Sequence, residues 1–347
     1  MPNTMPNRES RLKIKLIASD IDGTLLDSDH KLPLLTQEGL LKISLVRTDI
    51  TFMLATGKTL FASRDLMDKL HFLNNAFGVF LNGAIVVKRI IEGQVDNGSS
   101  TATTSATTTI TTTPQPNTTI TTTATTTTTT TTTGSDAPYC NTTSIPGYIV
   151  HQEQRISPLT ASWFLEKCIK DDITIALYSY DSIFTPFDYT PKHGPFFEYV
   201  HSFHEPTIQT TTHLVRDVKD GSLVIHKLML LVEPFKRDAL MDELIESVGF
   251  PKDVSLLPTM PEMLEVMLKG VSKACAIKFV CESMGVGMGN VMSFGDGSND
   301  YEMIQETGWG VAMKNGIESL KDIANDVCGS NDASGVPEYV MKYLEIE

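Results

Sequence analysis

Apolar runs and segments of helical spacing alternate through the first ninety residues. Residues 34–46 carry apolar side chains at intervals of three and four, which is typical of an amphipathic helix. Asn82-Gly83 separates two apolar runs and is a strong turn signal. We expect strands at 14–18, 50–55, 77–81 and 84–87, and helices at 34–46 and about 60–70. This order predicts a doubly wound α/β fold with a parallel sheet.

A threonine-rich tract then interrupts the pattern. Between residues 101 and 133, 23 of 33 residues are threonine. Such a tract has no apolar face, so it cannot offset the entropy lost when a backbone becomes ordered. We therefore expect a disordered insertion in a surface loop at about 94–144.

The globular pattern resumes after this tract and continues to the C-terminus. The expected strands are 147–150, 173–180, 223–232, 264–268 and 291–294, and the expected helices are 160–170, 237–248 and 272–284. We interpret the middle block as a second α/β domain inserted into the first. The predicted division is a discontinuous core at 1–87 and 266–347 and an inserted domain at 88–265, which contains the threonine-rich tract.

Composition narrows the classes of protein that this chain can represent. The formal charge of −14 over 347 residues disfavours nucleic acid or an anionic membrane surface as a partner. No apolar stretch approaches the roughly 20 residues of a membrane span, and the polar N-terminus lacks the apolar part of a signal peptide. The five dispersed cysteines are typical of reduced thiols. A cytoplasmic protein is expected, with its oligomeric state left open.

Two segments far apart in the chain place carboxylates and glycines directly after apolar runs. Asp20 and Asp22 follow the first expected strand, and Asp296 and Asp300 follow the expected strand at 291–294. The carboxyl ends of parallel strands are where such sheets keep their chemistry. Four carboxylates brought together would repel one another without a divalent cation, and Mg²⁺ suits an all-oxygen set completed by a substrate phosphate. We expect Mg²⁺ as the cofactor.

Four segments, in this order and spacing, resemble the motifs of the haloacid dehalogenase (HAD) superfamily. The matching residues are Asp20-Ile21-Asp22-Gly23-Thr24-Leu25, Thr56-Gly57, Lys273, and Gly295-Asp296-Gly297-Ser298-Asn299-Asp300. The segment at 308–316 is similar to one found in the Cof-type branch of that superfamily. The resemblance implies a Rossmann-like core, an inserted cap domain of the α/β type, and hydrolysis of small phosphorylated metabolites such as sugar phosphates, nucleotides, pyridoxal phosphate or flavin mononucleotide.

Phosphoryl transfer needs an in-line nucleophile and neutralised phosphoryl oxygens. We assign Asp20, at the end of the first strand, as the nucleophile that forms an aspartyl phosphate. Asp22 is the expected general acid and base, and the resemblance implies that its main-chain carbonyl binds the metal. Lys273 is expected to offset the charge on Asp20 and bind phosphate. Phosphate binding is also assigned to Thr56, Gly57 and Asn299, and metal binding to Asp20, Asp22, Asp296 and Asp300.

Some alternatives stay open at this point. A phosphomutase or phosphotransferase would use the same aspartyl phosphate, and a non-catalytic metal-binding interaction protein would represent another class. Lys58 stands where the family more often has Arg, so its contact with substrate is left open. The histidines His193, His201 and His204 are interpreted as surface residues. The aromatic residues at 178–203 are interpreted as core packing or, alternatively, as the wall of a substrate pocket.

Overall fold

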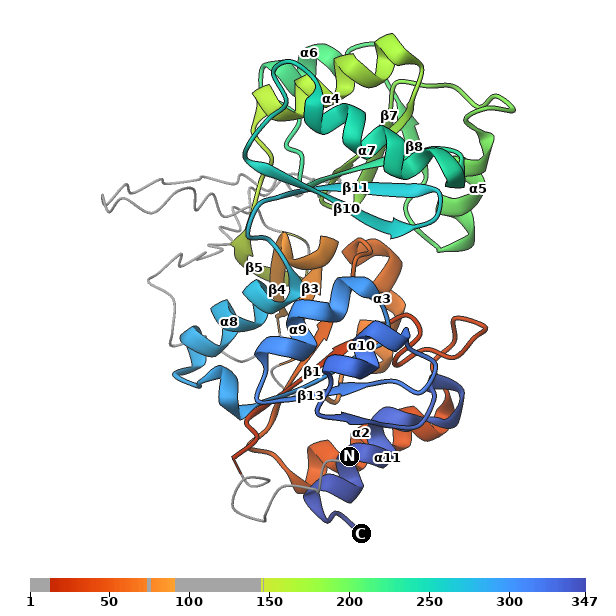
Figure 1. Ribbon diagram of the computed structural model, residues 1–347. Helices are drawn as coiled ribbons and strands as arrows, with labels where there is room; N and C mark the ends of the chain where they lie inside the picture. The colour runs from red at the N-terminus through yellow and green to blue at the C-terminus, as the bar shows by residue number, and fades with distance from the viewer. Residues whose placement is uncertain (1–12, 74–75, 91–144, 146) are drawn as a thin grey trace, which may run out of the picture. The chain divides into compact units, whose positions relative to one another are not determined.

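The computed structural model describes residues 13–73, 76–90, 145 and 147–347. These residues form two β-sheets, each with its own set of helices (Figure 1). The threonine-rich tract, for which disorder is expected, lies outside the described residues. Among the residues that are described, no helix combines the length and the apolar character needed to cross a bilayer.

The first sheet has eight strands in the order β14-β13-β12-β1-β2-β3-β4-β5. Its strands are β1 (Leu16–Asp20), β2 (Thr51–Ala55), β3 (Phe77–Phe80), β4 (Ile85–Arg89), β5 (Tyr148–Glu153), β12 (Val291–Gly295), β13 (Trp309–Ala312) and β14 (Asp326–Val327). The pairs from β14 to β3 are parallel, while β4 and β5 pair antiparallel at one edge. This topology confirms the predicted doubly wound α/β fold.

Helices cover both faces of this sheet, because its strands are apolar on both sides. The bounds are α2 (Leu34–Val46), α3 (Leu60–Lys69), α8 (Lys273–Met284), α9 (Tyr301–Glu306), α10 (Glu318–Ile323) and α11 (Gly335–Leu344). One buried cluster packs α2, α3 and α11 against one face, and another packs α8 and α9 against the other. Two helices begin beside the site with side-chain caps: Thr59 accepts from the N–H of Ala62, and Ser272 from that of Cys275.

The direction of winding reverses at β1. The chain moves from β1 to β2 on one side, and it later returns to place β12 on the other side of β1. In open parallel sheets, ligands bind beyond the carboxyl ends of the strands at such a reversal. Asp20 ends β1 and Gly295 ends β12, so the two acidic segments meet at this point.

The second sheet has six strands in the order β10-β11-β9-β6-β7-β8. Its elements are β6 (Thr174–Ser179), β7 (Ser182–Thr185), β8 (Ile208–Thr210), β9 (Lys227–Leu231), β10 (Val254–Met260) and β11 (Met263–Leu268), with α4 (Pro158–Asp171), α5 (Gly194–Ser202), α6 (Leu214–Lys219) and α7 (Arg237–Glu246). Helices α4, α6 and α7 pack on one face, and α5 packs on the other.

The sequence pattern missed several elements of this second sheet. Strands β7, β8 and β10 and helices α5 and α6 are absent from the expected set. They are short or, like β10, only partly buried, so their apolar periodicity is weak. The expectation that His193 lies at the surface is also wrong. Its ring is buried, Nδ1 lies 2.7 Å from the Thr174 hydroxyl, and it stacks on Phe187.

Strand β5 bears on where the two domains divide. It pairs with β4 in the eight-stranded sheet, although its residues fall inside the range expected for the inserted domain. The six-stranded sheet begins at β6 and ends at β11, and α4 packs on it. We propose that the inserted domain comprises about 154–270 and that the core includes the flanking strands.

Candidate active site

The loop after β1 is built around one close approach to the loop after β12. Gly23 has φ +71°, and a Cβ at this position would lie 2.3 Å from Oδ2 of Asp296. Only glycine accepts both the backbone conformation and the contact. One residue later, the Thr24 hydroxyl donates a hydrogen bond of 3.0 Å to Oδ1 of Asp296. The sequence Asp-Gly-Thr therefore fixes the two acidic segments against each other.

Lys273 is a fully buried cation between two carboxylates. It is the first residue of α8, and its Nζ lies 2.5 Å from Oδ1 of Asp20 and 2.7 Å from Oδ1 of Asp300. A buried charge is stable only when it is paired. Burial alone would lower the pKa of Lys273, but the charges of Asp20 and Asp300 outweigh this and raise it. Lys273 is therefore held as a cation beside Asp20.

Asp300 organises the turn after β12. Its Oδ2 accepts hydrogen bonds from the backbone N–H groups of Asp296 (2.9 Å) and Gly297 (3.0 Å), and its Oδ1 accepts from Lys273. Both carboxylate oxygens are thus engaged, although Asp300 was expected to bind metal. This arrangement fits the positioning of Asp296 and Lys273.

Three carboxylates crowd around the single lysine. Oxygen atoms of Asp20, Asp296 and Asp300 lie within 4.8 Å of one another. Burial and the charge of Asp300 raise the pKa of Asp296 to about 6. Burial also raises the pKa of Asp20 against the opposing charge of Lys273, and the charges of Asp300 and Asp296 add to the rise. The excess negative charge and the all-oxygen donor set fit a hard divalent cation of the Mg²⁺ type.

Asp22 lies beside this cluster and is paired differently. Its Oδ1 accepts a hydrogen bond of 2.6 Å from Nζ of Lys58 and lies 3.3 Å from Nδ1 of His30. About a quarter of its side chain is exposed, so it can reach solvent. The Lys58 ammonium also lies 5.2 Å from the centre of the Phe203 ring. Lys58, which stands where the family more often has Arg, therefore holds the carboxyl group of Asp22.

The remaining predicted phosphate-binding residues lie on adjacent loops. Asp20 pairs with Ala55 at the end of β2, so Thr56 and Gly57 follow directly beside the loop that carries Asp22. The buried Thr56 hydroxyl accepts from the N–H of Lys58 at 3.1 Å. The side chain of Asn299 is bonded to the loop between β3 and β4, where its Nδ2 donates to Oδ1 of Asn82 at 3.1 Å.

Sequence reasoning missed the polar residues of the second sheet that reach these loops. Lys227 and Glu265 lie in apolar strands, and Glu205 follows α5. Glu205 accepts hydrogen bonds from the N–H (3.3 Å) and the hydroxyl (2.7 Å) of Thr59. Isolated charged residues within apolar strands were the available signal. Asn82 was identified only as part of a turn.

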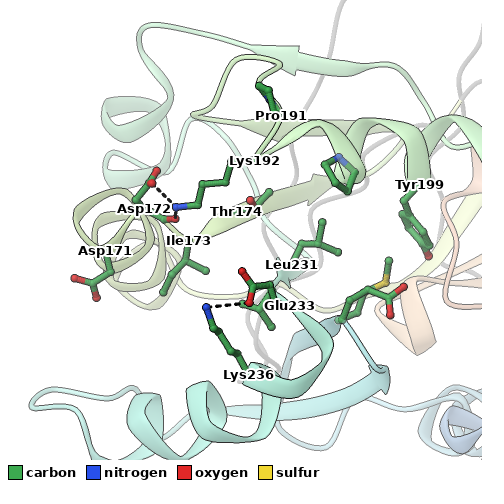
Figure 2. Close-up of a pocket in the computed structure, with 14 residues that line it drawn as sticks. Asp171, Asp172, Ile173, Thr174, Pro191, Lys192, Tyr199, Leu231, Glu233 and Lys236 are labelled. Carbon is green, nitrogen blue, oxygen red and sulfur yellow. Dashed lines mark hydrogen bonds and ion pairs between the residues drawn. The ribbon is translucent and has the colours of Figure 1, made fainter.

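The second domain carries a groove of its own (Figure 2). Its volume is about 830 Å³, and its wall includes Thr174, Leu231 and Tyr199. Two lysines on its rim are already paired, Lys192 with Asp172 and Lys236 with Glu233.

Tyr178, for which a pocket position was one alternative, is fully buried and packs under Nζ of Lys227 at 4.4 Å from the ring centre. Core packing therefore accounts for Tyr178.

Comparison with known proteins finds several relatives that are named as phosphatases. The chain is 34% identical over 107 residues to the 5-amino-6-(5-phospho-D-ribitylamino)uracil phosphatase YcsE of Bacillus subtilis, a match to 31% of this chain and 43% of that protein. It is 37% identical over 81 residues to a phosphoglycolate phosphatase of Methanobrevibacter smithii, a match to 23% of this chain and 35% of that protein. The chain thus spans less than half the length of the curated relatives it matches.

Solved structures share the fold over nearly their whole length. A haloacid dehalogenase-like hydrolase from Bacteroides thetaiotaomicron superposes with a TM-score of 0.68 at 20% identity and covers 95% of this chain and 99% of that one. A HAD subclass IIB sugar phosphatase, BT4131, superposes with a TM-score of 0.64 at 17% identity and covers 96% of this chain and 100% of that one. These matches show the predicted HAD core with its cap domain.

The family model described as haloacid dehalogenase-like hydrolase matches residues 17–137 and 139–340. This match includes all four motifs and both sheets, and it confirms the resemblance that the sequence indicates. The chain belongs to the haloacid dehalogenase-like hydrolase family.

Proposed function

We propose that this protein is a Mg²⁺-dependent phosphomonoester hydrolase that acts on small phosphorylated metabolites. The observation that carries the proposal is the arrangement around Asp20. Its carboxylate ends a buried strand, lies 2.5 Å from the Lys273 ammonium, and shares the site with Asp296 and Asp300. A nucleophilic carboxylate beside a fixed cation and an oxygen-rich metal site has the parts that phosphoryl transfer requires.

The first chemical step forms a bond between an Oδ atom of Asp20 and phosphorus. The bond from phosphorus to the ester oxygen breaks, and the carboxyl group of Asp22 donates its proton to the leaving alkoxide. Lys273 neutralises charge on the phosphoryl oxygens, and Thr56, Gly57 and Asn299 hold them through N–H and hydroxyl groups.

The second step returns the enzyme to its starting state. Asp22, now a carboxylate, takes a proton from water as the water oxygen attacks phosphorus. The bond to Asp20 breaks, and inorganic phosphate leaves. Lys58 and His30 contact Oδ1 of Asp22 and would hold this side chain in place during both transfers.

The metal would be held by side-chain oxygens of Asp20 and Asp296 and by the main-chain carbonyl of Asp22. A bound Mg²⁺ would supply charge neutralisation for the transferring group. Asp300 would act mainly by holding Asp296 and Lys273, because both of its oxygens already accept hydrogen bonds.

The substrate class is proposed from the relatives. Their names specify phosphorylated small molecules, a ribityl phosphate and a phosphoglycolate. The shared core supplies the chemistry and says little about the leaving group. Sugar phosphates, nucleotides, pyridoxal phosphate and flavin mononucleotide are therefore the panel to test.

The test is a screen of that panel with the full chain, which measures released phosphate in Mg²⁺ and in excess EDTA. We expect Mg²⁺-dependent release from at least one ester, with a free alcohol as the second product. An isomeric sugar phosphate in place of free phosphate would identify a phosphomutase instead. No conversion of any ester by protein with a native circular dichroism spectrum would overturn the proposal.

A further inference from the structure

The loop that joins β3 to β4 has an unusual backbone. Leu81 (φ 52°) and Asn82 (φ 54°) both adopt the left-handed region, which is rare for a residue such as leucine. Gly83 follows with φ +106°, and a Cβ there would lie 2.3 Å from the carbonyl oxygen of Ser272. The loop is therefore pressed against the start of α8, where Lys273 emerges. Strained conformations of this kind persist where the surroundings enforce them, often at functional sites.

The Asn82 side chain is buried and uses both ends of its amide. Its Nδ2 donates a hydrogen bond of 2.7 Å to Oε2 of Glu265 in β11. Its Oδ1 accepts a hydrogen bond of 3.1 Å from Nδ2 of Asn299. A carboxylate only accepts, so the Glu265 contact fixes which end of the amide faces Asn299. Asn82 thus links the second sheet to the loop after β12.

Glu265 is one half of a buried ion pair on the second sheet. Nζ of Lys227 lies 3.2 Å from Oε1 of Glu265 and donates a hydrogen bond of 2.8 Å to the carbonyl oxygen of Gly57. Both side chains are less than a tenth exposed. Burying this pair is costly unless its remaining hydrogen-bonding capacity is used. Two loops of the core supply the missing partners: the Gly57 carbonyl accepts from Lys227, and the Asn82 amide donates to Glu265.

We propose that Asn82 is a positioning residue that aligns Asn299 for phosphate binding, and that the Lys227–Glu265 pair sets its orientation. The inference rests on the proposed function, in which Gly57 and Asn299 contact the phosphoryl group. It adds that phosphate affinity in the core depends on this ion pair of the second domain. Neither Lys227 nor Glu265 needs to touch substrate for this effect.

Asp181 makes a contact between the same two domains that lies away from the loops at Gly57 and Asn82. Asp181 accepts hydrogen bonds from the N–H of Phe61 (2.8 Å) and from Arg64 (2.9 Å), both in α3. Its substitution provides a matched control, because Asp181→Asn weakens a contact between the same domains and leaves Asn82 untouched.

The decisive variants reverse the hydrogen bond between positions 82 and 265. Asn82→Asp keeps an acceptor for Asn299 but sets two carboxylates against each other. Glu265→Gln alone leaves one oxygen to serve both Lys227 and Asn82. In the double variant N82D/E265Q, the new amide at 265 donates to the new carboxylate at 82 and still accepts from Lys227. The double variant therefore restores every contact, and only the hydrogen bond between positions 82 and 265 changes direction.

The measurement is the affinity of the full chain for inorganic phosphate in the presence of Mg²⁺, by titration calorimetry, with the melting temperature recorded for each variant. We expect each single substitution to weaken phosphate binding by about tenfold or more, since it leaves a buried polar group unpaired. The double variant should return to within about threefold of the parent, and Asp181→Asn should stay within about twofold. The KM for esters should rise in parallel with the dissociation constant for phosphate.

Two results would overturn the inference. If Asn82→Asp and Glu265→Gln lower the melting temperature but bind phosphate as the parent does, Asn82 is only structural. If the double variant binds no better than the single variants, the hydrogen bond does not orient Asn299. Both outcomes leave the proposed function intact. Failure of the unsubstituted protein to bind phosphate or hydrolyse any ester would overturn the proposed function as well.

Discussion

Substitution of Lys273 by methionine tests the charge balance of the site. Nζ of Lys273 lies 2.5 Å from Asp20 and 2.7 Å from Asp300, and the three carboxylates lie within 4.8 Å of one another. At an effective dielectric constant of about 20, each ion pair contributes roughly 6 kcal/mol and each carboxylate pair costs roughly 3.5 kcal/mol or more. Two attractions and three repulsions therefore nearly cancel while the lysine is present.

Without the lysine, only the repulsions remain. Protonation of one or two carboxyl groups would limit the cost, so we expect a loss of about 3–5 kcal/mol in the free energy of unfolding, as for other broken buried pairs. The assay is urea unfolding at pH 7 in EDTA. The loss in the free energy of unfolding should become smaller as the pH falls toward 5, because the carboxyl groups then take up protons. It should also become smaller on addition of Mg²⁺.

Asp20→Asn provides the contrast. It removes one attraction of roughly 6 kcal/mol and two repulsions whose sum has a similar size. The free energy of unfolding in EDTA should therefore change by less than about 1 kcal/mol. Turnover should fall at least about 10³-fold, or about 4 kcal/mol of barrier, because the nucleophile is lost. If Lys273→Met were as stable as the parent in EDTA, the charge counting would be refuted. Turnover of Asp20→Asn within tenfold of the parent would refute the nucleophile assignment.

Three further outcomes are expected. Activity should disappear in excess EDTA and return with Mg²⁺ but poorly with Ca²⁺, whose looser coordination suits the site less; full turnover in the chelator would contradict the metal site. Deletion of residues 98–133 should leave the melting temperature and turnover nearly unchanged, since doubling a loop costs only about 0.6 kcal/mol; loss of soluble expression would show that the tract is needed. Burial alone would raise the pKa of Glu153, but hydrogen bonds from His226, Arg155 and Tyr180 lower it to about 2. A lowered pKa stabilises the fold above pH ~4.5 and loses this effect as the pH falls toward 2, so Glu153→Gln should flatten the acid limb of the stability curve by about 1–2 kcal/mol, and an unchanged acid limb would contradict the reasoning.

The sequence predicts the core sheet well because its signals are local. The central strands are short apolar runs: β1 ends at Asp20, β12 ends at Gly295, and β2 leads directly into Thr56-Gly57. Thr59 and Ser272 cap two helices that begin close to the positions expected from the sequence. The order of these elements limits the topology to a doubly wound sheet, which brings Asp20 and Asp296 together.

The second sheet is harder to predict because much of its packing is decided at a distance. Helix α5 spans only nine residues with Pro195 in its first turn, and β10 contains Pro258, so neither segment gives a strong signal in the sequence. The partners of Asp22 illustrate the same limit. Lys58 comes 36 residues later in the chain, and only the fold places its ammonium 2.6 Å from the Asp22 carboxylate.

Lys227 and Glu265 show why the link to Asn82 could not be predicted from periodicity. A charged residue within an apolar strand usually indicates an exposed face, yet both of these side chains are buried. The register of β9 and β11 pairs Lys227 with Met267 and Met229 with Glu265, so the two charges are diagonal neighbours on one face. That face also bears Tyr178, which packs against Lys227, and its two charges reach the Gly57 carbonyl and the Asn82 amide. Each of these charges would weaken an isolated strand, and its hydrogen bonds are completed only when the second sheet meets the loops at Gly57 and Asn82. Because the pair needs these contacts, it is suited to align the two loops.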